Sequence, residues 1–277
     1  MESGYWSKDT KLDVKMSKIR DVVLCADAHS DELAADFFGL KVETVRRYRR
    51  WCRDFPQPSI QEDQGNILII PDLHAPFIKK GYLDFCTRMA KKWNCTKFIF
   101  IGDLIDNHYS GYHETDPDGL SGRAELELAI EQIHDFHKAF PVATVLIGNH
   151  DAIPNRKAFT SGVSSRWVRS IGETLGVPNW EFKETHWEGD IMFVHGIGRK
   201  AHTRMRQDMV SVVQGHYHAE SYIKWQVGAN RRTFAMQLGC GVDSASYAAA
   251  YAKHFMAQHI NVGVLLNGKT PLIEYMD

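Results

Sequence analysis

The sequence lacks the features of secreted and membrane-spanning proteins. Its five cysteines are odd in number and widely scattered, and none belongs to a Cys-x-x-Cys pair. That usage predicts neither a disulfide framework nor a zinc knuckle. No apolar run approaches the roughly 18 residues that a membrane helix needs, and residues 1–15 lack the apolar core of a signal peptide. We therefore expect a cytoplasmic protein with no membrane contact.

An excess of charge of either sign is also absent. The 277 residues include 33 Lys and Arg and 34 Asp and Glu, for a formal net charge of −1. A uniformly basic surface is thereby excluded, so any contact with nucleic acid must come from a local patch. Hydrophobic residues at 44% and charged residues at 24% are the usage of a folded protein and not of a disordered chain.

The chain is predicted to divide into two domains. Residues 1–54 have a helical pattern, and residues 55–65 are predicted to be a linker because Pro56, Pro58 and a polar run cannot continue a helix. In residues 66–277, apolar runs of four to six residues alternate with longer amphipathic segments, which is typical of a layered α/β fold. A main domain of about 200 residues with a small addition suits this length.

Short polar blocks follow five of the apolar runs. In chain order the blocks are Asp72-Leu73-His74, Gly102-Asp103-Leu104-Ile105-Asp106, Gly148-Asn149-His150-Asp151, His195-Gly196 and Gly215-His216-Tyr217-His218. Loops beyond the carboxyl ends of strands converge at one edge of a sheet, so we expect the blocks to meet there. Asp, Asn and His supply the oxygen and nitrogen ligands that a pair of divalent ions about 3.5–4 Å apart needs, with one carboxylate shared. The blocks therefore predict a two-metal site that hydrolyses phosphate esters.

The order of these blocks resembles the calcineurin-like metallophosphoesterase superfamily over residues 66–277. The resemblance implies an α/β fold built as a two-layer β-sandwich flanked by helices. It also implies one ligand set for each ion. The first set is Asp72, His74 and His218, and the second set is Asn149, His195 and His216. By the same resemblance Asp103 bridges the two ions.

His150 lies next to a ligand without being one in the family pattern. A histidine can protonate a leaving alkoxide at physiological pH, so His150 is the candidate for a general acid or charge stabiliser. The resemblance implies that Asp106 is its carboxylate partner. Members of the superfamily that act on phosphoproteins carry Asp-Arg-Gly at the end of the second block, where this chain has Asp106-Asn107-His108. That departure favours phosphodiesterase or nuclease activity.

Further side chains are candidates for substrate contacts. His108 and His113 belong to the segment 107–122, which is long enough to be either a substrate lid or a plain connection. Arg156 closely follows the third block and is a candidate contact for a substrate phosphate.

Residues 31–50 resemble a helix-turn-helix DNA-binding unit. Gly39 suits the turn because it accepts the positive φ that a tight helix-to-helix corner needs. The small or apolar residues at packing positions are Leu33, Ala35, Leu40, Val45 and Tyr48. The second helix is similar to a recognition helix in its density of arginine, and the residues expected to contact nucleic acid are Arg46, Arg47, Arg49, Arg50 and Arg53. Two alternatives to DNA binding stay open: the unit is a protein-docking module, or the basic helix is only a solvated face.

The favoured function is hydrolysis of phosphodiester bonds in nucleic acid by a hydroxide that two divalent metal ions activate, with the N-terminal module binding DNA. We expect Mn²⁺, and Fe, Zn and Ni also suit these ligands. Two alternatives stay open: a phosphatase or phosphodiesterase for phosphoproteins or small molecules, and a DNA-binding regulator without turnover. The combination of modules suits a bacterial or bacteriophage protein. The physiological substrate, the strand preference, the endo- or exonuclease mode and the oligomeric state stay undecided.

Overall fold

The computed structural model describes residues 19, 22–23, 25–27, 29–54, 65–112, 119–228, 231–246 and 257–276, without the side chains of 51–54. The chain divides into two units, Met1–Glu62 and Asp63–Asp277. Among the described residues, no helix is both long enough and apolar enough to cross a membrane. The larger unit holds two β-sheets and all the polar blocks.

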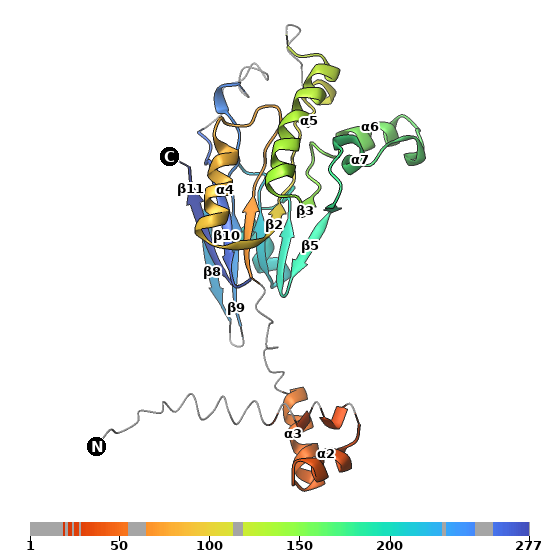
Figure 1. The fold of residues 1–277 in the computed structure, drawn as a ribbon, viewed down its shortest axis with the longest axis vertical. Coiled ribbons are helices and arrows are strands. Elements are labelled where there is room, and N and C mark those ends of the chain that lie inside the picture. The colour runs from red at the N-terminus through yellow and green to blue at the C-terminus, as the bar shows by residue number, and fades with distance from the viewer. Residues whose placement is uncertain are drawn as a thin grey trace, which may run out of the picture. The chain divides into compact units, whose positions relative to one another are not determined.

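The first sheet has the strand order β11-β10-β1-β2-β3-β4, and β11, β10, β2 and β3 are labelled in Figure 1. Its strands are β1 (Asn66–Ile70), β2 (Cys95–Phe100), β3 (Ala143–Leu146), β4 (Trp180–Lys183), β10 (Asn261–Leu266) and β11 (Thr270–Tyr275). β1 to β4 pair in parallel, whereas β10 runs antiparallel to β1 and to β11. The central β1 is apolar and almost wholly buried, as is usual for parallel strands that are covered on both faces.

The second sheet has the strand order β5-β6-β7-β9-β8. Its strands are β5 (Thr185–Glu188), β6 (Ile191–Val194), β7 (Ser211–Gln214), β8 (Tyr222–Val227) and β9 (Arg232–Gln237). β6, β7 and β9 pair in parallel, and β5 and β8 add to the two edges in antiparallel. Every residue of β6 and β7 is buried, so the centre of this sheet is also covered on both faces.

Alternate residues of β1 face the two sides of the first sheet, as the period of two in a strand requires. Ile67 and Ile69 pack between the two sheets, whereas Leu68 and Ile70 face the helices on the opposite side. The helices on that side are α4 (Tyr82–Lys92), α5 (Gly122–Ala139) and α7 (Ile171–Leu175). Two apolar layers therefore fix the sheet edge at which the polar blocks meet.

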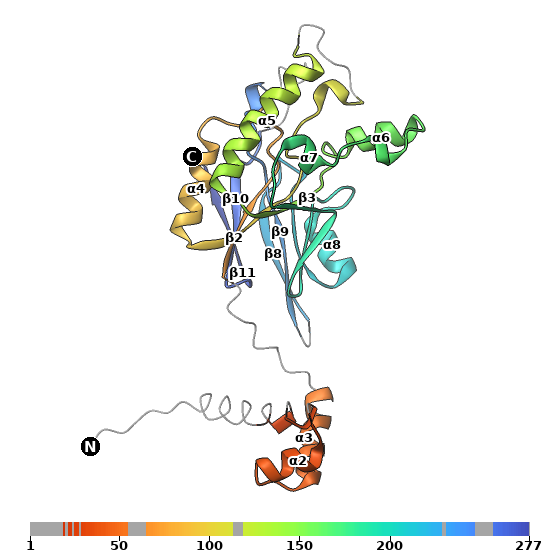
Figure 2. The same cartoon turned by 45° about the vertical axis from the view of Figure 1, so that its right-hand side comes forward.

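The helix α8 (Ala201–Asp208) covers the outer face of the second sheet (Figure 2). Its Ala201 and Met205 pack on Met192 and Val212. The remaining helical elements of this unit are η1 (His108–Ser110), α6 (Ile153–Thr160) and η2 (Ser165–Trp167). The layers are thus helices, sheet, sheet and helix. The prediction of a mixed α/β fold with two sheets and flanking helices is confirmed.

The smaller unit contains α2 (Asp31–Phe37) and α3 (Val42–Asp54). Gly39 stands between them with a φ of +63°, the left-handed conformation that a glycine adopts without strain. Ala35 and Val45 are buried in a small apolar core that the two helices share. The corner between the helices therefore depends on Gly39.

The packing position predicted for Leu33 is wrong. Its side chain is 52% exposed. The face of α2 that enters the core carries the smaller side chains of Ala34 and Ala35 instead. Two alanines allow α3 to approach α2 closely, and a leucine on that face would hold the helices apart.

Candidate metal centre

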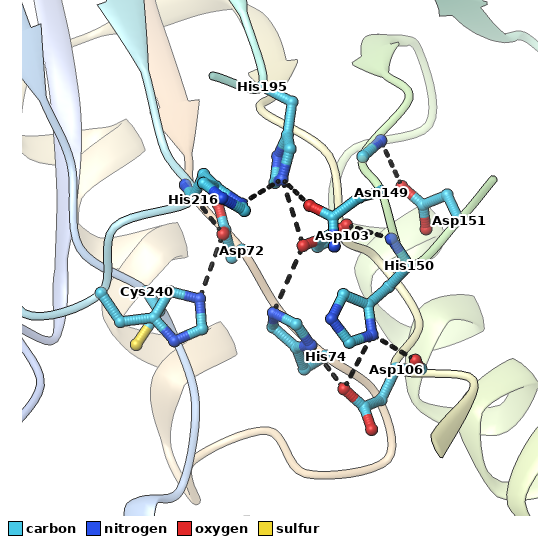
Figure 3. A network of polar contacts seen from close by, with 12 residues as sticks. Asp72, His74, Asp103, Asp106, Asn149, His150, Asp151, His195, His216 and Cys240 are labelled. Carbon is cyan, nitrogen blue, oxygen red and sulfur yellow. Dashed lines mark hydrogen bonds and ion pairs between the residues drawn. The ribbon is translucent and has the colours of Figure 1, made fainter. Parts of the chain in front are cut away.

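The polar blocks meet in the loops that follow β1, β2, β3, β6 and β7 (Figure 3). In three of these loops a predicted ligand has a left-handed backbone, with φ of +47° at His74, +46° at Asp103 and +71° at His216. Such angles are uncommon for residues other than glycine and cost of order 1–3 kcal/mol each. The packed layers hold these ligands in a conformation that a free chain avoids.

Two glycines let the blocks approach one another. A Cβ atom on Gly148 would overlap the backbone nitrogen and the carboxylate of Asp103. A Cβ atom on Gly215 would overlap the carboxylate of Asp72. Any side chain at either position would displace a predicted ligand, which explains why the third and fifth blocks begin with glycine.

Asp72, His74 and His218 form the first predicted ligand group. One ligand atom of each lies within 4.8 Å of the others. Oδ2 of Asp72 lies 3.1 Å from Nε2 of His218 and accepts a hydrogen bond of 2.9 Å from the backbone N–H of His216. Oδ1 of Asp72 is buried and accepts no hydrogen bond from the described residues. A buried carboxylate oxygen of this kind suits a bound cation.

Asp103, His195 and His216 form the second group, again within 4.8 Å. Nδ1 of His195 donates to the carbonyl of Ile101 at 3.0 Å, which leaves Nε2 for the site. Nε2 of His195 lies 3.0 Å from Oδ1 of Asn149 and 3.2 Å from Nδ1 of His216. The amide of Asn149 therefore joins this group as a fourth donor.

Asp103 lies between the two groups. Its Oδ2 is 3.1 Å from Nε2 of His195 and 3.6 Å from Nε2 of His74. Its Oδ1 accepts a hydrogen bond of 2.8 Å from the backbone N–H of His150. One carboxylate oxygen thus faces a histidine of each group.

Burial and charge act on the pKa values of the site in opposite directions. Burial acts to raise the pKa of Asp72 and Asp103, but the nearby histidines, His195 foremost, hold both pKa values below the usual range. Burial acts to lower the pKa of His195, and the carboxylates of Asp103 and Asp72 outweigh it and raise this pKa to about 9. For His74 and His216 burial prevails and lowers the pKa, so both rings are neutral near pH 7.

This donor set fits divalent metal ions. The two buried carboxylates require positive charge nearby, which the protonated ring of His195 supplies. A divalent cation on the same atoms would take over that role and release the proton. The neutral rings of His74 and His216 offer nitrogen lone pairs, and imidazole, amide and carboxylate groups are ligands for the same class of metals.

Asp106 is shared between two histidines. Its Oδ1 accepts from Nδ1 of His74 at 2.6 Å and lies 3.3 Å from Nδ1 of His150. Nδ1 of His150 donates to the backbone carbonyl of Asp106 at 2.5 Å. The predicted partner of His150 therefore orients His74 as well, and through the shorter contact. Because Nδ1 carries the hydrogen in both rings, Nε2 of each is left for the site.

His150 lies at the metal centre itself. His74, Asp103 and His150 form a third group whose ligand atoms lie within 4.8 Å of one another. This group shares His74 and Asp103 with the two ligand groups, so the ring of His150 is within reach of a phosphate ester held there. That position suits a proton donor to the leaving group.

Asp151 holds two of the blocks together, a role that the sequence analysis did not assign. Its carboxylate accepts hydrogen bonds of 2.9–3.3 Å from the backbone N–H groups of Leu104, Ile105 and Gly148. Burial and the Asp103 carboxylate raise the pKa of Asp151 to about 7. The sequence feature that could have indicated this role of Asp151 is its position as an acid at the end of the third block, directly after His150.

The predicted substrate contacts have different places. Arg156 lines an open pocket of about 350 Å³ beside Asn149 and His195. His108 is buried on η1. His113 lies outside the described residues. Of the two that are described, Arg156 is the one that borders the pocket at the metal centre.

Two of the arginines predicted to contact nucleic acid form ion pairs within the smaller unit. Arg46 lies 3.3 Å from both Asp31 and Glu32. Arg49 lies 2.7 Å from Asp27 and 2.8 Å from Asp31. These arginines join α3 to α2 and to the residues before it, so a nucleic-acid phosphate would have to compete with carboxylates for them.

The other predicted arginines differ. Arg47 and Arg50 are exposed, and neither forms an ion pair with another described residue. The side chain of Arg53 lies outside the described part of the chain. The basic surface that α3 offers to an anionic partner is therefore smaller than its arginine content indicates.

The chain matches the calcineurin-like phosphoesterase family over residues 65–239. It therefore belongs to this family. The family and the His and Asp groups together assign a metal-binding hydrolase that acts on phosphoesters. The matched residues include all the polar blocks.

Several solved structures are similar to this chain at low sequence identity. The phosphoesterase Yfce from E. coli is 12% identical, covering 76% of this chain and 100% of that chain with a TM-score of 0.35. Vps29 from Chaetomium thermophilum is 11% identical, covering 73% and 81% with a TM-score of 0.37. The nuclease MPE from Pseudomonas putida is 13% identical, covering 73% and 84% with a TM-score of 0.37. No curated protein matches the chain.

Proposed function

We propose that this protein hydrolyses phosphodiester bonds in nucleic acid with two divalent metal ions, Mn²⁺ being the expected metal. The observation that carries the proposal is the position of Asp103. One oxygen of its carboxylate faces both His74 and His195, which belong to different ligand groups. A carboxylate shared between two ligand groups is what a two-metal site for phosphoester hydrolysis needs.

The ligand groups divide the work of holding the ions. Asp72, His74 and His218 would hold one ion, and Asn149, His195 and His216 the other, with Asp103 between them. When bound, the ions supply Lewis acidity toward the phosphoryl oxygens and lower the pKa of a water molecule. The chain itself supplies the orientation, since the Asp106 carboxylate and the Ile101 carbonyl each fix the ring of a ligand histidine.

His150 supplies the proton for the leaving alkoxide. Its Nδ1–H is fixed on the Asp106 carbonyl, so the proton that can be transferred is the one on Nε2. The Asp106 carboxylate lies 3.3 Å from Nδ1 and helps to orient the ring. When the alkoxide takes that proton, the ring becomes neutral and is protonated again from water.

The place of Asn107 supports a diester as substrate. A phosphomonoester is mostly dianionic at neutral pH, and superfamily members that act on phosphoproteins grip it with an arginine after the second block. Here Asn107 is uncharged, and its Nδ2 donates to the carbonyl of His150 at 2.9 Å. The Asn107 side chain therefore holds the third block in place. It offers no positive charge to balance the second negative charge of a phosphomonoester.

The helical N-terminal module, residues 1–54, supplies the affinity for DNA in this proposal, with residues 55–65 as the linker. The exposed side chains of Arg47 and Arg50 on α3 support it, because they are free of ion pairs among the described residues. Phosphate contacts of this kind give a binding affinity that falls as the salt concentration rises.

A substrate panel with Mn²⁺ tests the proposal. The wild type, Asp103→Asn and His150→Ala are compared on bis(p-nitrophenyl) phosphate, p-nitrophenyl phosphate, single-stranded DNA and duplex DNA. We expect the wild type to cleave DNA and to cleave the diester faster than the monoester, and both variants to lose most turnover. If the wild type hydrolyses the monoester faster than the diester and leaves DNA uncleaved, the protein is a phosphatase instead. DNA binding without any turnover would identify a regulator.

A further inference from the structure

Arg204, which belongs to none of the polar blocks, lines the pocket beside the metal centre. The pocket has a volume of about 350 Å³, and the predicted ligands Asn149 and His195 form part of its wall. Arg156 of α6 and Arg204 of α8 line the same pocket. Two arginines from separate helices therefore line a pocket that the candidate metal centre also borders.

Contacts with the loop after His195 hold Arg204 at this pocket. Its Nη2 donates to the carbonyl of Ile197 at 3.4 Å. Its Nε is buried and has no hydrogen-bond acceptor among the described residues. A buried donor without an acceptor costs free energy. Arg204 forms no ion pair with another described residue, so its guanidinium can take an anionic oxygen that enters the pocket.

Arg156 lies against the ring of Tyr112. The guanidinium carbon of Arg156 lies 5.6 Å from the centre of the Tyr112 ring, and Nζ of Lys157 lies 5.4 Å from the same ring. Lys157 also donates to the carbonyl of Gly111 at 3.3 Å. Within the described residues the Arg156 guanidinium forms no ion pair, so its positive charge is available to an anion in the pocket.

One carboxylate also lines the pocket. Glu184 lies between β4 and β5, is exposed, and forms no ion pair with another described residue. Its charge opposes an anionic guest, but the two guanidinium groups outweigh it. The pocket therefore suits one additional anionic group, and Glu184 offers a substitution whose effect on anion binding is opposite in sign to that of Arg204.

We infer that Arg204 and Arg156 form a subsite for the phosphate next to the scissile phosphate of an oligonucleotide. The inference rests on the proposed function, since it places the scissile phosphate at the metal centre. Guanidinium groups match phosphate oxygens with paired hydrogen bonds, which explains the use of arginine at both positions. A substrate with a second phosphate gains contacts that a diester with a single phosphate cannot make.

Two dye-labelled thymidine dinucleotides test the subsite by fluorescence anisotropy. Both carry a hydrolysis-resistant phosphorothioate linkage, and one of them also carries a 5′-phosphate. We expect the wild-type full-length protein with Mn²⁺ to bind the 5′-phosphorylated probe about tenfold more tightly, in keeping with the strength of charged hydrogen bonds. Arg204→Gln should remove most of that preference, and Glu184→Gln should increase it. Arg206→Gln, on the same helix but outside the pocket, is the matched control and should keep the wild-type ratio.

An unchanged preference in Arg204→Gln, or no preference in the wild type, overturns the subsite. Equal losses in Arg204→Gln and Arg206→Gln also overturn it, because they would reflect only the overall charge of α8. Hydrolysis of bis(p-nitrophenyl) phosphate is measured on the same samples. If the wild type fails to cleave this diester while the probe preference still depends on Arg204, the proposed function fails, and Arg204 binds a phosphate that is not next to a scissile one.

Discussion

Gly148 packs directly against Asp103, and the third block reaches the shared carboxylate only because position 148 has no side chain. Gly148→Ala should therefore displace Asp103 and lower kcat by about 10²-fold, the scale of a displacement of roughly 1 Å at a reacting centre. The measurement is Mn²⁺-dependent diester hydrolysis. Gly228→Ala is the control, since its Cβ would meet only ordinary contact with the carbonyl of Arg231. Equal activity in both variants would contradict this reading of the contact.

His150→Ala should lower kcat on diesters by about 10²–10⁴-fold, the usual contribution of a general acid. The bound metal should stay at the wild-type level, because the two sets of residues proposed to hold the ions do not include His150, although it lies close to His74 and Asp103. Turnover and metal content by elemental analysis are measured on the same sample. His137→Ala, a helix residue that contacts the carbonyl of Pro178, is the control. Loss of one ion from His150→Ala would show that His150 is a ligand.

Asp106→Asn should weaken metal binding at the ligand group of His74. The carboxylate accepts the 2.6 Å hydrogen bond that orients this ring. Loss of such an outer partner commonly costs about 10–100-fold in metal affinity or activity. Calorimetric titration with Mn²⁺ should show one weakened site and one site close to the wild type. If both sites keep their affinity, the contact with His74 has no role in binding.

The stability of the smaller unit should depend on pH through Asp31. A hydrogen bond from Arg49, assisted by Arg46, holds the pKa of Asp31 below its usual value of 3.8. An acid whose pKa is lower in the folded state than in the unfolded state stabilises the fold at pH values above the unfolded-state pKa. That stabilisation is lost as the pH falls through the folded-state pKa. Hydrogen exchange of α2 and α3 in the full chain should therefore show protection falling below about pH 4. In Asp31→Asn the same amides should lose this dependence.

Arg47 and Arg50 should account for more of any DNA affinity than Arg46 and Arg49. The latter pair already contacts carboxylates, whereas the former pair is free among the described residues. The double variant Arg47→Gln/Arg50→Gln should lower the slope of log affinity against log salt by up to about 1.8, since each lost phosphate contact removes about 0.9. Arg46→Gln is the comparison and should change the slope less. An equal change in both variants would show that the ion pair leaves Arg46 free to bind phosphate.

The central strands and the meeting of the polar blocks could be predicted from the sequence because local pattern determines them. The apolar runs 67–70, 144–147 and 191–194 coincide with β1, β3 and β6 to within one residue at each end. Strands buried on both faces show their apolar character in the sequence itself. The blocks that follow these strands come together because every one of them stands at a carboxyl end.

The edges of the second sheet and the wall of the pocket could not be predicted in this way. β5 and β8 mix charged, polar and aromatic residues and are only partly buried. Their strand conformation depends on pairing with β6 and β9, which lie elsewhere along the chain. Arg204 lies on a short helix without a motif, and only the packing of α8 on the second sheet places it near His195.

The left-handed backbone at His74, Asp103 and His216 has a consequence for how the protein is loaded with metal. The packed layers hold these angles, so we expect the ligand cage to keep its shape before an ion binds. A chelator should then empty the protein without unfolding it, and fresh ions should restore it without a refolding step.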